Sequence, residues 1–453
     1  MPWHALAETR QGRVLRTFIK SAARFSRDPS GSSFWLRFFL KSVKKRGLKL
    51  ITLYLLYGMS AEDDHVRAES ESTVEEFVSF DDMELPQELL RGIYAYGFEK
   101  PSEIQKKGIV PIAKGRDLIA QAQSGTGKTG TFTIGSLARI DVSVKQVQVL
   151  CLLPTRELAQ QVELVASAIG GSMGIKTYAA MGKTPVREDI RALDRGVHFL
   201  VGTPGRIYDL MNRNAFSTAN IKVIIIDEAD QMLEDRFREQ LQCILGLGFP
   251  TTARCALFSA TMNADVVEFA EKLLDNPVRI LIAPEDVNLK GIRQYRVDLD
   301  REDWKFEVLL DLYKNLNITQ ALIYCNKRQK AEWLAEKMTG AGFPITCIHG
   351  DMEVRERMDR MTSFRKGDTR VLISTDLLAR GIDVQQVSLV INYELPMQMD
   401  NYIHRIGRSG RYGRKGNAIN LLSTDDMRAM SEIEAYYKIK VDMLPQDLST
   451  IQL

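Results

Sequence analysis

The sequence has few cysteines and no apolar stretch of membrane-spanning length, and both absences narrow what the protein can be. Only five of its 453 residues are cysteine, and no two of them form a Cys-x-x-Cys pair. This argues against a zinc site or a disulfide framework and favours reduced, packed thiols. The apolar run Leu50–Tyr57 is far shorter than the ~20 residues that a helix needs to span a bilayer. We therefore predict an intracellular, cytoplasmic protein without a membrane anchor.

Acidic residues are nearly missing from the first 58 positions. This stretch holds 12 Lys and Arg against 2 Asp and Glu, whereas the remainder holds 49 basic and 56 acidic residues. The net charge of +3 therefore hides a main body with a balance of −7, which excludes a globally basic nucleic-acid binder. The basic stretch fits a transit-type segment, a basic amphipathic surface helix, or an upstream extension of the reading frame. We favour the last, because Met59 opens an ordinary acidic tail of the disordered type.

A glycine-rich stretch after the first predicted strand indicates a phosphate-binding loop. Residues 122–129 are Ala-Gln-Ser-Gly-Thr-Gly-Lys-Thr, between a predicted strand at 116–120 and a predicted helix at 131–140. Strand, glycine-rich loop and helix is the context that a P-loop requires, although the strict pattern opens with Gly where this chain has Ala122. The alternative is an ordinary glycine-rich turn.

The residue types in this loop suit the parts of a nucleotide. Glycines have no Cβ, so backbone N–H groups of the loop and the helix N-terminus can turn toward an anion. Lys128 adds a positive charge for the outer phosphates, and Thr129 offers a hydroxyl to Mg²⁺. The predicted nucleotide-binding residues of the loop are Ser124, Gly125, Thr126, Gly127, Lys128 and Thr129.

Apolar runs of strand length alternate with helical patterns in two series along the chain. The polar segment 283–290 separates the two series, and only the first contains a glycine-rich phosphate loop. Such alternation predicts an α/β fold with doubly wound parallel sheets. We predict an extension at 1–76, a first domain at 77–283, a short flexible linker at 284–291 and a second domain at 292–453. The predicted strands are 116–120, 147–153, 198–201, 223–226 and 256–258, then 321–325, 345–348, 371–374, 389–392 and 418–422. The predicted helices are 85–96, 101–113, 131–140, 157–169 and 237–245, then 330–338 and 353–364.

The predicted strand at 223–226 runs directly into Asp227-Glu228-Ala229-Asp230. A carboxylate at such a strand end can reach the magnesium of a P-loop, so Thr129 and Asp227 are the predicted metal ligands. Glu228 suits a carboxylate that orients and deprotonates an attacking water. The alternative is a solvated acidic turn.

Asp-Glu-Ala-Asp is the signature of the DEAD-box RNA helicases, and other motifs of that family follow in its order from Phe80 to Arg411. Over about residues 77–445 the chain therefore resembles a DEAD-box RNA helicase. The resemblance implies two tandem RecA-like domains, ATP and Mg²⁺ as cofactors, and RNA-stimulated ATP hydrolysis coupled to domain closure and local duplex unwinding.

The resemblance also implies roles on the ATP side. Phe98 and Gln105 of the segment Gly97–Gln105 would stack on adenine and read its edge, and Asp383 would contact the ribose. Arg408 and Arg411 would reach the γ-phosphate from the second domain. The catalytic residues implied are Lys128, Asp227, Glu228, Arg408 and Arg411.

On the RNA side, two motifs that start at Pro154 and Thr203 each open a predicted helix. Each places a hydroxyl and an Arg at the helix N-terminus, where they can bind the phosphates of a nucleic-acid backbone. The residues implied to bind single-stranded RNA without sequence preference are Pro154, Thr155, Arg156, Gly182, Thr203, Gly205, Arg206, Arg357 and Thr375. Those implied to couple the two sites are Ser259, Thr261, Asp230 and His404, with the two hydroxyls bonding the Asp227–Asp230 turn. The family usually has Gly at Met181 and Gln at Val354, so the RNA side matches less fully than the ATP side.

Within the family, residues 382–393 most resemble members that unwind mRNA 5′ leaders in translation initiation. That implies a scaffold protein of the cap-binding initiation complex as partner, and a monomer in its absence. A similar paralogue, an ATP-gated RNA clamp of the exon-junction type with slow turnover, is the alternative. A DNA-directed or transport ATPase fits the motifs less well.

Overall fold

The computed structural model describes residues 75–123, 125–281, 292–316, 318–376, 387–409, 416–448 and 451, apart from the side chains of Arg236 and Val354. All of them belong to one compact unit, Glu75–Leu453. Several predictions lie outside the described residues: those for residues 1–74, Ser124, the linker at 284–291, Asp383, Arg411 and the Val354 side chain.

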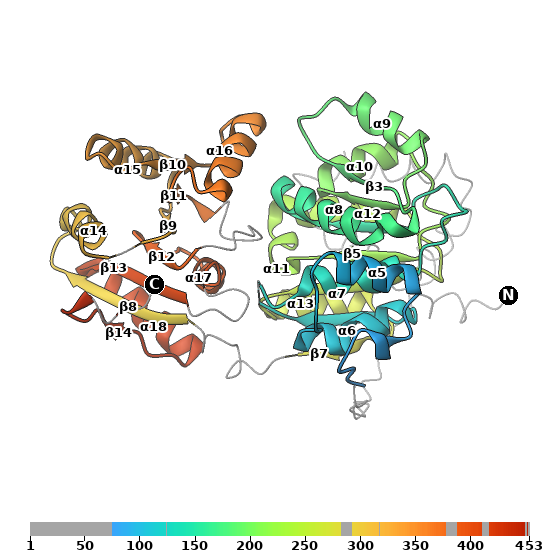
Figure 1. The fold of residues 1–453 in the computed structure, drawn as a ribbon, viewed down its shortest axis with the longest axis horizontal. Helices are drawn as coiled ribbons and strands as arrows, with labels where there is room; N and C mark the ends of the chain where they lie inside the picture. Colours follow the sequence, from blue (N-terminus) through green and yellow to red (C-terminus); the bar gives the residue numbers. More distant parts are fainter. Residues whose placement is uncertain are drawn as a thin grey trace, which may run out of the picture. The chain divides into compact units, whose positions relative to one another are not determined.

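The first sheet has seven parallel strands in the order β3-β4-β2-β5-β6-β1-β7. Figure 1 labels β3, β5 and β7 of this sheet among the helices that flank it. The central strands of the sheet are continuous apolar runs because both faces are covered, as in other doubly wound sheets. On one face, Ile224 and Leu257 pack in the hydrophobic core with Leu210 and Leu241. On the other face, the ring centroids of Phe258 and Phe132 are 5.3 Å apart. The strands are β1 Leu118–Gln121, β2 Val149–Leu152, β3 Thr177–Ala180, β4 Phe199–Gly202, β5 Val223–Ile226, β6 Arg254–Ser259 and β7 Val278–Ile280.

The helices of this half follow or connect the strands. They are α5 Gln87–Ala95, α6 Glu103–Ala113, α7 Lys128–Leu137, α8 Arg156–Gly170, α9 Val186–Asp194, α10 Pro204–Asn212, α11 Ala229–Met232, α12 Asp235–Gly246 and α13 Ala264–Leu273, with 3₁₀ turns at Asp81–Met83 and Gly171–Met173. Since every strand of the sheet is parallel, the loops that follow the strands all emerge at its carboxyl edge, where ligands of open α/β sheets bind.

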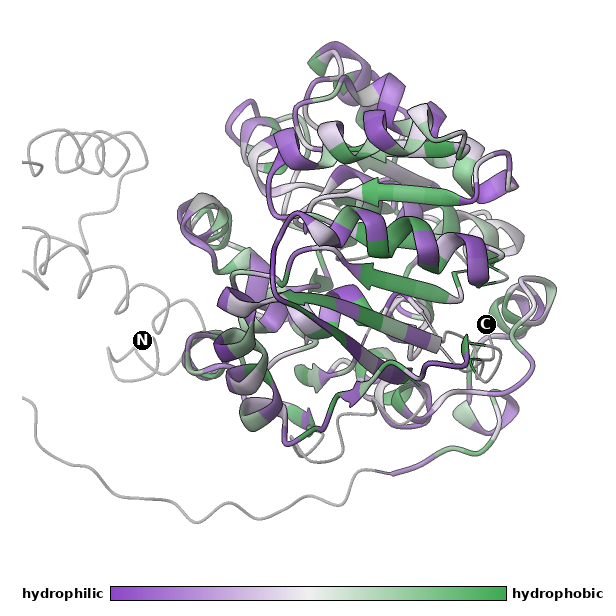
Figure 2. Cartoon of the chain, turned by 90° about the vertical axis from the view of Figure 1, so that its left-hand side faces the viewer, coloured by the Kyte–Doolittle hydropathy of each residue, from purple (hydrophilic) through white to green (hydrophobic). Residues whose placement is uncertain are grey.

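The second sheet is also parallel and seven-stranded, in the order β10-β11-β9-β12-β13-β8-β14. Its strands are β8 Ile292–Leu299, β9 Ala321–Tyr324, β10 Ile345–Ile348, β11 Val371–Ser374, β12 Leu389–Asn392, β13 Gly416–Ser423 and β14 Asp442–Met443. Its helices are α14 Trp304–Asn315, α15 Arg328–Gly340, α16 Val354–Lys366, α17 Met399–Ile406 and α18 Met427–Tyr437, with a 3₁₀ turn at Thr424–Asp426. In Figure 2 most strands are coloured as hydrophobic, whereas the helices carry a mixture of hydrophobic and hydrophilic residues.

The predicted α/β class with two doubly wound parallel sheets is confirmed. All ten predicted strands and all seven predicted helices have counterparts, although helix α7 begins three residues before its predicted start. The prediction missed β3, β7, β8 and β14 and several helices, among them α9, α13 and α17. The proposed domain boundaries remain predictions. In the part of the chain that the structure describes, none of the helices combines the length and the apolar character needed to cross a membrane.

Candidate nucleotide and RNA site

The phosphate-binding loop leaves β1 at the carboxyl edge of the first sheet and enters α7. Gly125 and Gly127 have φ values of 83° and 104°, a left-handed backbone that favours glycine. The Thr126 hydroxyl donates to the Gln123 carbonyl at 2.7 Å and tightens the turn. Lys128 and Thr129 occupy the first turn of α7. The strand, loop and helix predicted around this motif are therefore present.

The Lys128 ammonium points at the carboxylates that follow β5. Its Nζ lies 3.2 Å from Glu228 Oε1 and 3.7 Å from Asp227 Oδ1, and all three side chains are buried. Burial alone would lower the pKa of Lys128, but the charges of Glu228, Asp227 and Asp230 raise it above its ordinary value. Burial raises the pKa of Asp227 to about 6, against the opposing effect of Lys128. Residues of two motifs that lie far apart in the sequence thus share one buried, charged site.

Glu228 stands in a backbone conformation that is unusual for its residue type. Its φ and ψ are 50° and 52°, and it precedes the short helix α11. A left-handed non-glycine residue costs about 1–3 kcal/mol and persists only where its surroundings impose it. Here the Glu228 N–H donates to Asp227 Oδ1 at 2.9 Å. In this conformation the Glu228 carboxylate lies beside Lys128, with Oε1 3.2 Å from Nζ.

Asp230 contacts three other residues, Ser259, Thr261 and His404. The Ser259 hydroxyl accepts from the Asp230 N–H at 3.3 Å, and the Thr261 hydroxyl donates to Asp230 Oδ2 at 3.2 Å. The predicted bonds between these hydroxyls and the acidic turn are thus confirmed. His404 Nε2 lies 3.1 Å from the same Asp230 oxygen, and Thr261 Oγ1 is 3.4 Å from Asp400 Oδ2. The end of β6, the residues just after it and helix α17 therefore meet at Asp230.

Gln105 links the segment before α6 to the phosphate loop. Its Oε1 accepts from the Ser102 N–H at 2.9 Å, and its Nε2 donates to the Gly127 carbonyl at 3.4 Å. A Cβ at Gly130 would lie 2.5 Å from Gln105 Nε2 and 3.2 Å from the Phe98 ring, so glycine makes room for both. Phe98 and Gln105 therefore lie beside the phosphate loop, as a base-binding role requires.

Several predicted RNA-binding residues gather after β2, β3 and β4. Pro154 and Thr155 precede α8, and the Thr155 hydroxyl accepts from the Leu158 N–H at 3.3 Å. A Cβ at Gly182 would lie 3.2 Å from Arg156 Nη2, so Gly182 and Arg156 are adjacent. Thr203 and Gly205 lie at the N-terminus of α10. Since β2, β3 and β4 are neighbouring parallel strands, these groups share one edge of the sheet.

The side chains of Arg206 and Arg357 are buried and not exposed to solvent. Arg206 is 7% exposed and is held by Asp189 and Thr184, a pairing that no local sequence pattern signalled. Arg357 is 6% exposed, and its Nη2 lies 3.3 Å from Glu157 Oε1.

Two further predicted residues belong to the second half of the described chain. Thr375 follows β11 and is partly buried. Arg408 is 2% exposed, and its Nε donates to the His404 carbonyl at 3.1 Å. The role of Arg408 at a γ-phosphate stays a prediction.

The sequence interpretation assigned no role to Arg405, which organises the second half of the site. This side chain is fully buried, with Nε 2.5 Å from Asp376 Oδ1 and Nη2 2.7 Å from Asn326 Oδ1. It also donates to the Glu394 carbonyl at 2.6 Å. Its position in the predicted arginine run was the available signal, but only the structure shows that it braces three loops.

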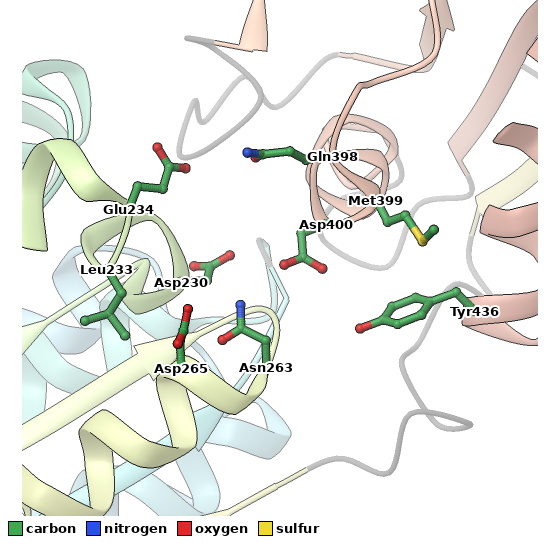
Figure 3. Close-up of a pocket in the computed structure, with 9 residues that line it drawn as sticks. All are labelled: Asp230, Leu233, Glu234, Asn263, Asp265, Gln398, Met399, Asp400 and Tyr436. Atoms are coloured by element: carbon green, nitrogen blue, oxygen red, sulfur yellow. The ribbon is translucent and has the colours of Figure 1, made fainter.

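An acidic cavity of about 420 Å³ adjoins the Asp230 contact (Figure 3). Asp230 and Asp265 face Asp400 and Tyr436 across it. It is lined by Asp230, Leu233, Glu234, Asn263, Asp265, Gln398, Met399, Asp400 and Tyr436, with no Lys or Arg among them. Four carboxylates would repel phosphates, so this cavity does not suit the phosphate groups of a nucleotide.

The residues at the phosphate loop fit a magnesium nucleotide. The Thr129 hydroxyl and the Asp227 carboxylate are hard oxygen donors of the type that Mg²⁺ prefers. Burial raises the pKa of Asp227 although Lys128 lies beside it, and a divalent cation bound to this carboxylate would favour its charged form. The left-handed glycines and the start of α7 supply the backbone geometry of an anion cradle.

The fold and this site define a P-loop nucleotide hydrolase built from two tandem RecA-like halves. A family model described as DEAD/DEAH box helicase matches residues 102–269, and one described as helicase conserved C-terminal domain matches residues 304–413. The chain belongs to the DEAD/DEAH box helicase family. The predicted resemblance is thereby confirmed, and with it the prediction of an ATP-hydrolysing RNA helicase.

Individual relatives agree with this assignment. The chain is 50% identical over 394 residues to ATP-dependent RNA helicase eIF4A of Mycosarcoma maydis, covering 87% of this chain and 95% of that one. It is 51% identical over 373 residues to eukaryotic initiation factor 4A of Caenorhabditis elegans, covering 82% and 92%. Among solved structures, S. cerevisiae Dbp5 bound to RNA and ADP BeF3 is similar with a TM-score of 0.76 and 35% identity, covering 82% of this chain and 96% of that one.

Proposed function

We propose that this chain is an ATP-dependent RNA helicase of translation initiation that unwinds RNA locally, using the residues assembled around Lys128. The observation that carries the proposal is the buried set of Lys128, Asp227 and Glu228. It joins a phosphate loop to two carboxylates on the neighbouring segment. The similarity to initiation factors 4A over more than four-fifths of the chain supports the translation role over an exon-junction type of clamp.

The chain's own residues divide the work of hydrolysis. Gly125, Gly127 and the N-terminus of α7 hold the phosphates, and Lys128 exchanges its carboxylate partners for the outer phosphates. Thr129 and Asp227 hold Mg²⁺, which supplies positive charge to the transferring phosphoryl group. Glu228 orients the attacking water and accepts its proton.

The second half of the chain contributes charge and coupling. Arg408 and Arg411 stabilise the transition state, as an arginine finger does. Asp383 binds the ribose, while Phe98 and Gln105 bind adenine. Because Asp230 contacts His404, Ser259 and Thr261 together, RNA and ATP each favour the arrangement in which these contacts form. Their affinities are then reciprocally coupled.

Single-stranded RNA lies over the carboxyl edges of β2, β3 and β4, and on the second half at Arg357 and Thr375. Backbone contacts there give little sequence preference. A scaffold protein of the cap-binding complex is the proposed partner, with a monomer in its absence and the cytoplasm as location. The domain limits proposed are 77–283 and 292–453, joined by the linker 284–291.

Steady-state ATPase measurements test this proposal directly. The full chain and a chain beginning at Met59 are assayed alone, with an RNA oligomer and with the matching DNA oligomer. We expect stimulation by RNA well above that by DNA, multiple turnovers, and the same behaviour without residues 1–58. A single turnover without release of phosphate would favour the clamp, and equal stimulation by DNA would contradict an RNA-directed enzyme.

A further inference from the structure

A buried ion pair lies behind the loop that carries Gly182. Asp189, on α9, is 1% exposed and accepts from Arg206 Nη1 through Oδ2. Its other oxygen accepts from the Tyr178 hydroxyl at 2.7 Å. Burial and the hydrogen bond to Asp189 raise the pKa of the Tyr178 hydroxyl, so it remains a proton donor. Three neighbouring elements, β3, α9 and α10, are therefore tied together by one carboxylate.

Arg206 passes this constraint to the loop between β3 and α9. Its Nη1 donates to the Thr184 hydroxyl at 3.2 Å, and its Nη2 donates to the Thr184 carbonyl at 2.6 Å. The Thr184 hydroxyl in turn donates to the Met181 carbonyl at 2.7 Å. Between them, Lys183 has a φ of 66°, a conformation that costs energy for a non-glycine residue. The bonds from Arg206 help to hold this strained turn closed.

The same turn sets the surroundings of Arg156. Gly182 lies so close to Arg156 that a Cβ there would be 3.2 Å from Nη2. The charges of Arg357 and Arg206 lower the pKa of Arg156 further, after burial, so three guanidinium groups influence one region. Among the described residues, Arg206 pairs with Asp189 and Arg357 pairs with Glu157. The position of the turn therefore decides how Arg156 is presented.

We propose that Asp189 is a positioning residue for RNA binding: it fixes Arg206, Arg206 fixes the turn at residues 181–184, and the turn fixes Gly182 and Arg156 for the RNA backbone. In this arrangement Arg206 acts through the turn instead of by contact with a phosphate. The proposal rests on the proposed function, because it concerns the RNA surface of the same helicase.

If Asp189 acts only through its charge, its removal should leave RNA affinity the same or higher. If Asp189 positions the turn, its removal should lower RNA affinity. If Asp189 were only a nearby acid, replacing it by Asn would remove repulsion and leave RNA affinity the same or higher. If it positions the turn, D189N weakens RNA binding although it makes the chain more positive. A buried guanidinium that loses its carboxylate is costly, and the strained turn loses its support.

The experiment measures binding of a fluorescent oligouridylate to the full chain with a non-hydrolysable ATP analogue, together with the RNA dependence of ATPase. We expect D189N to raise both the dissociation constant and the RNA concentration for half-maximal stimulation by about tenfold, within the range of coupling by residues that do not touch the ligand. The KM for ATP without RNA and the turnover rate at saturating RNA should stay near those of the native chain. A merely structural role would lower the active fraction without shifting the RNA concentration dependence.

Matched variants make the result specific. E188Q removes an exposed acid from the same helix and should leave RNA affinity unchanged or slightly higher. Y178F removes one bond to Asp189 and should shift RNA affinity in the same direction as D189N, but less.

The outcomes separate the two proposals. If the native chain neither binds RNA nor responds to it, the proposed function fails. If the native chain responds and D189N binds RNA as tightly as the native chain, the positioning role is overturned while the function stands. Should D189N fail to fold, Y178F decides: native RNA affinity in that variant overturns the positioning role.

Discussion

The two sheets share one strand order, yet equivalent strand ends carry different chemistry. Strands β1–β7 and β8–β14 follow the same pattern in sequence, so β8 occupies the place of β1 and α14 the place of α7. Each of these helices has a buried lysine in its first turn, Lys128 in α7 and Lys305 in α14. The two lysines differ in the loop before them and in their partners.

Lys305 already forms ion pairs with two acidic residues of its own half. Its Nζ lies 2.8 Å from Glu302 Oε2 and 2.7 Å from Asp426 Oδ2. Burial alone would raise the pKa of Asp426, but hydrogen bonds from Lys305 and Ser423 lower it. The loop before α14 contains acids and no glycine, so it would repel a phosphate. A buried lysine at this place in the fold therefore makes a nucleotide site only when the loop supplies backbone N–H groups.

The acidic residues that follow β5 and β12 also have different partners. After β5, Asp227 and Glu228 face a lysine, whereas after β12 the Glu394 Oε2 accepts from the Asn326 N–H at 2.7 Å. The second half thus uses its carboxylate to fix loops, and Arg405 joins the same network. One architecture thus carries the proposed catalytic site in the first half and a network of bonds between loops in the second.

The largest expected effect is that of E228Q. Removing the proposed base should lower the RNA-stimulated turnover rate by about 10²–10⁴ while nucleotide binding persists. Steady-state ATPase and binding of a labelled nucleotide measure the two quantities. E394Q is the matched control, because Gln can still accept from Asn326, and it should retain most of the hydrolysis. A normal rate in E228Q would remove Glu228 from the role of base.

The two lysines should separate binding from stability. Lys128→Ala should raise the dissociation constant of ATP about 10–100-fold, the loss expected for a hydrogen bond to a charged group. Lys305→Met should leave that constant unchanged but destabilise the second half by about 2 kcal/mol, since a buried charge network loses its cation. Calorimetric nucleotide titration and denaturant unfolding give the two values. Weakened ATP binding in Lys305→Met would contradict the prediction that Lys305 stabilises the fold without contributing to nucleotide binding.

A smaller effect concerns the stability of the nucleotide-free chain. The pKa of Asp227 is about 6 in the fold against an ordinary 3.8, so ionising it opposes folding. This cost is absent below pH 3.8 and complete above pH 6. Asp227→Asn should therefore raise the melting temperature at pH 8 by about 2–4 °C per kcal/mol relieved, with no gain near pH 4. Its hydrolysis should be lost.

The control for that measurement is Asp194→Asn, at an exposed position at the end of α9. It should leave the melting temperature nearly unchanged at both pH values. A gain of stability in Asp227→Asn that persists unchanged at pH 4 would mean that the charge of Asp227 is not its cause.

The parts of the fold that the sequence predicted well are those buried on both faces. The bounds of β5, β10, β11 and β12 match the predicted runs, because a strand covered on both sides is mostly apolar and so stands out in the sequence. Strand β8 was missed because Arg293, Arg296 and Asp298 interrupt its apolar residues. Helix α7 starts within the predicted loop, since its first turn is the phosphate-binding turn itself.

The site was predictable where one motif sits on one loop, and less so where distant motifs pair. The order of motifs indicated Lys128 and Glu228 together, although 100 positions separate them. The Arg206–Asp189 pair and the bracing role of Arg405 had no such signal, because each depends on tertiary packing of several elements. The sequence predicted Arg206 as a phosphate contact, whereas its buried donors are directed at Thr184 and Asp189.

The place of β1 in the first sheet has a consequence for synthesis on the ribosome. Its two neighbours are β6 and β7, with Leu118 opposite Ala256 on one side and Val278 on the other. Both partners are translated more than a hundred residues later, so a nascent chain carries an apolar strand with two open edges for most of that interval. Such edges invite pairing with other chains. We therefore expect truncated products that end before β6 to aggregate or to be captured by chaperones, whereas chains that extend past Ile280 should be soluble.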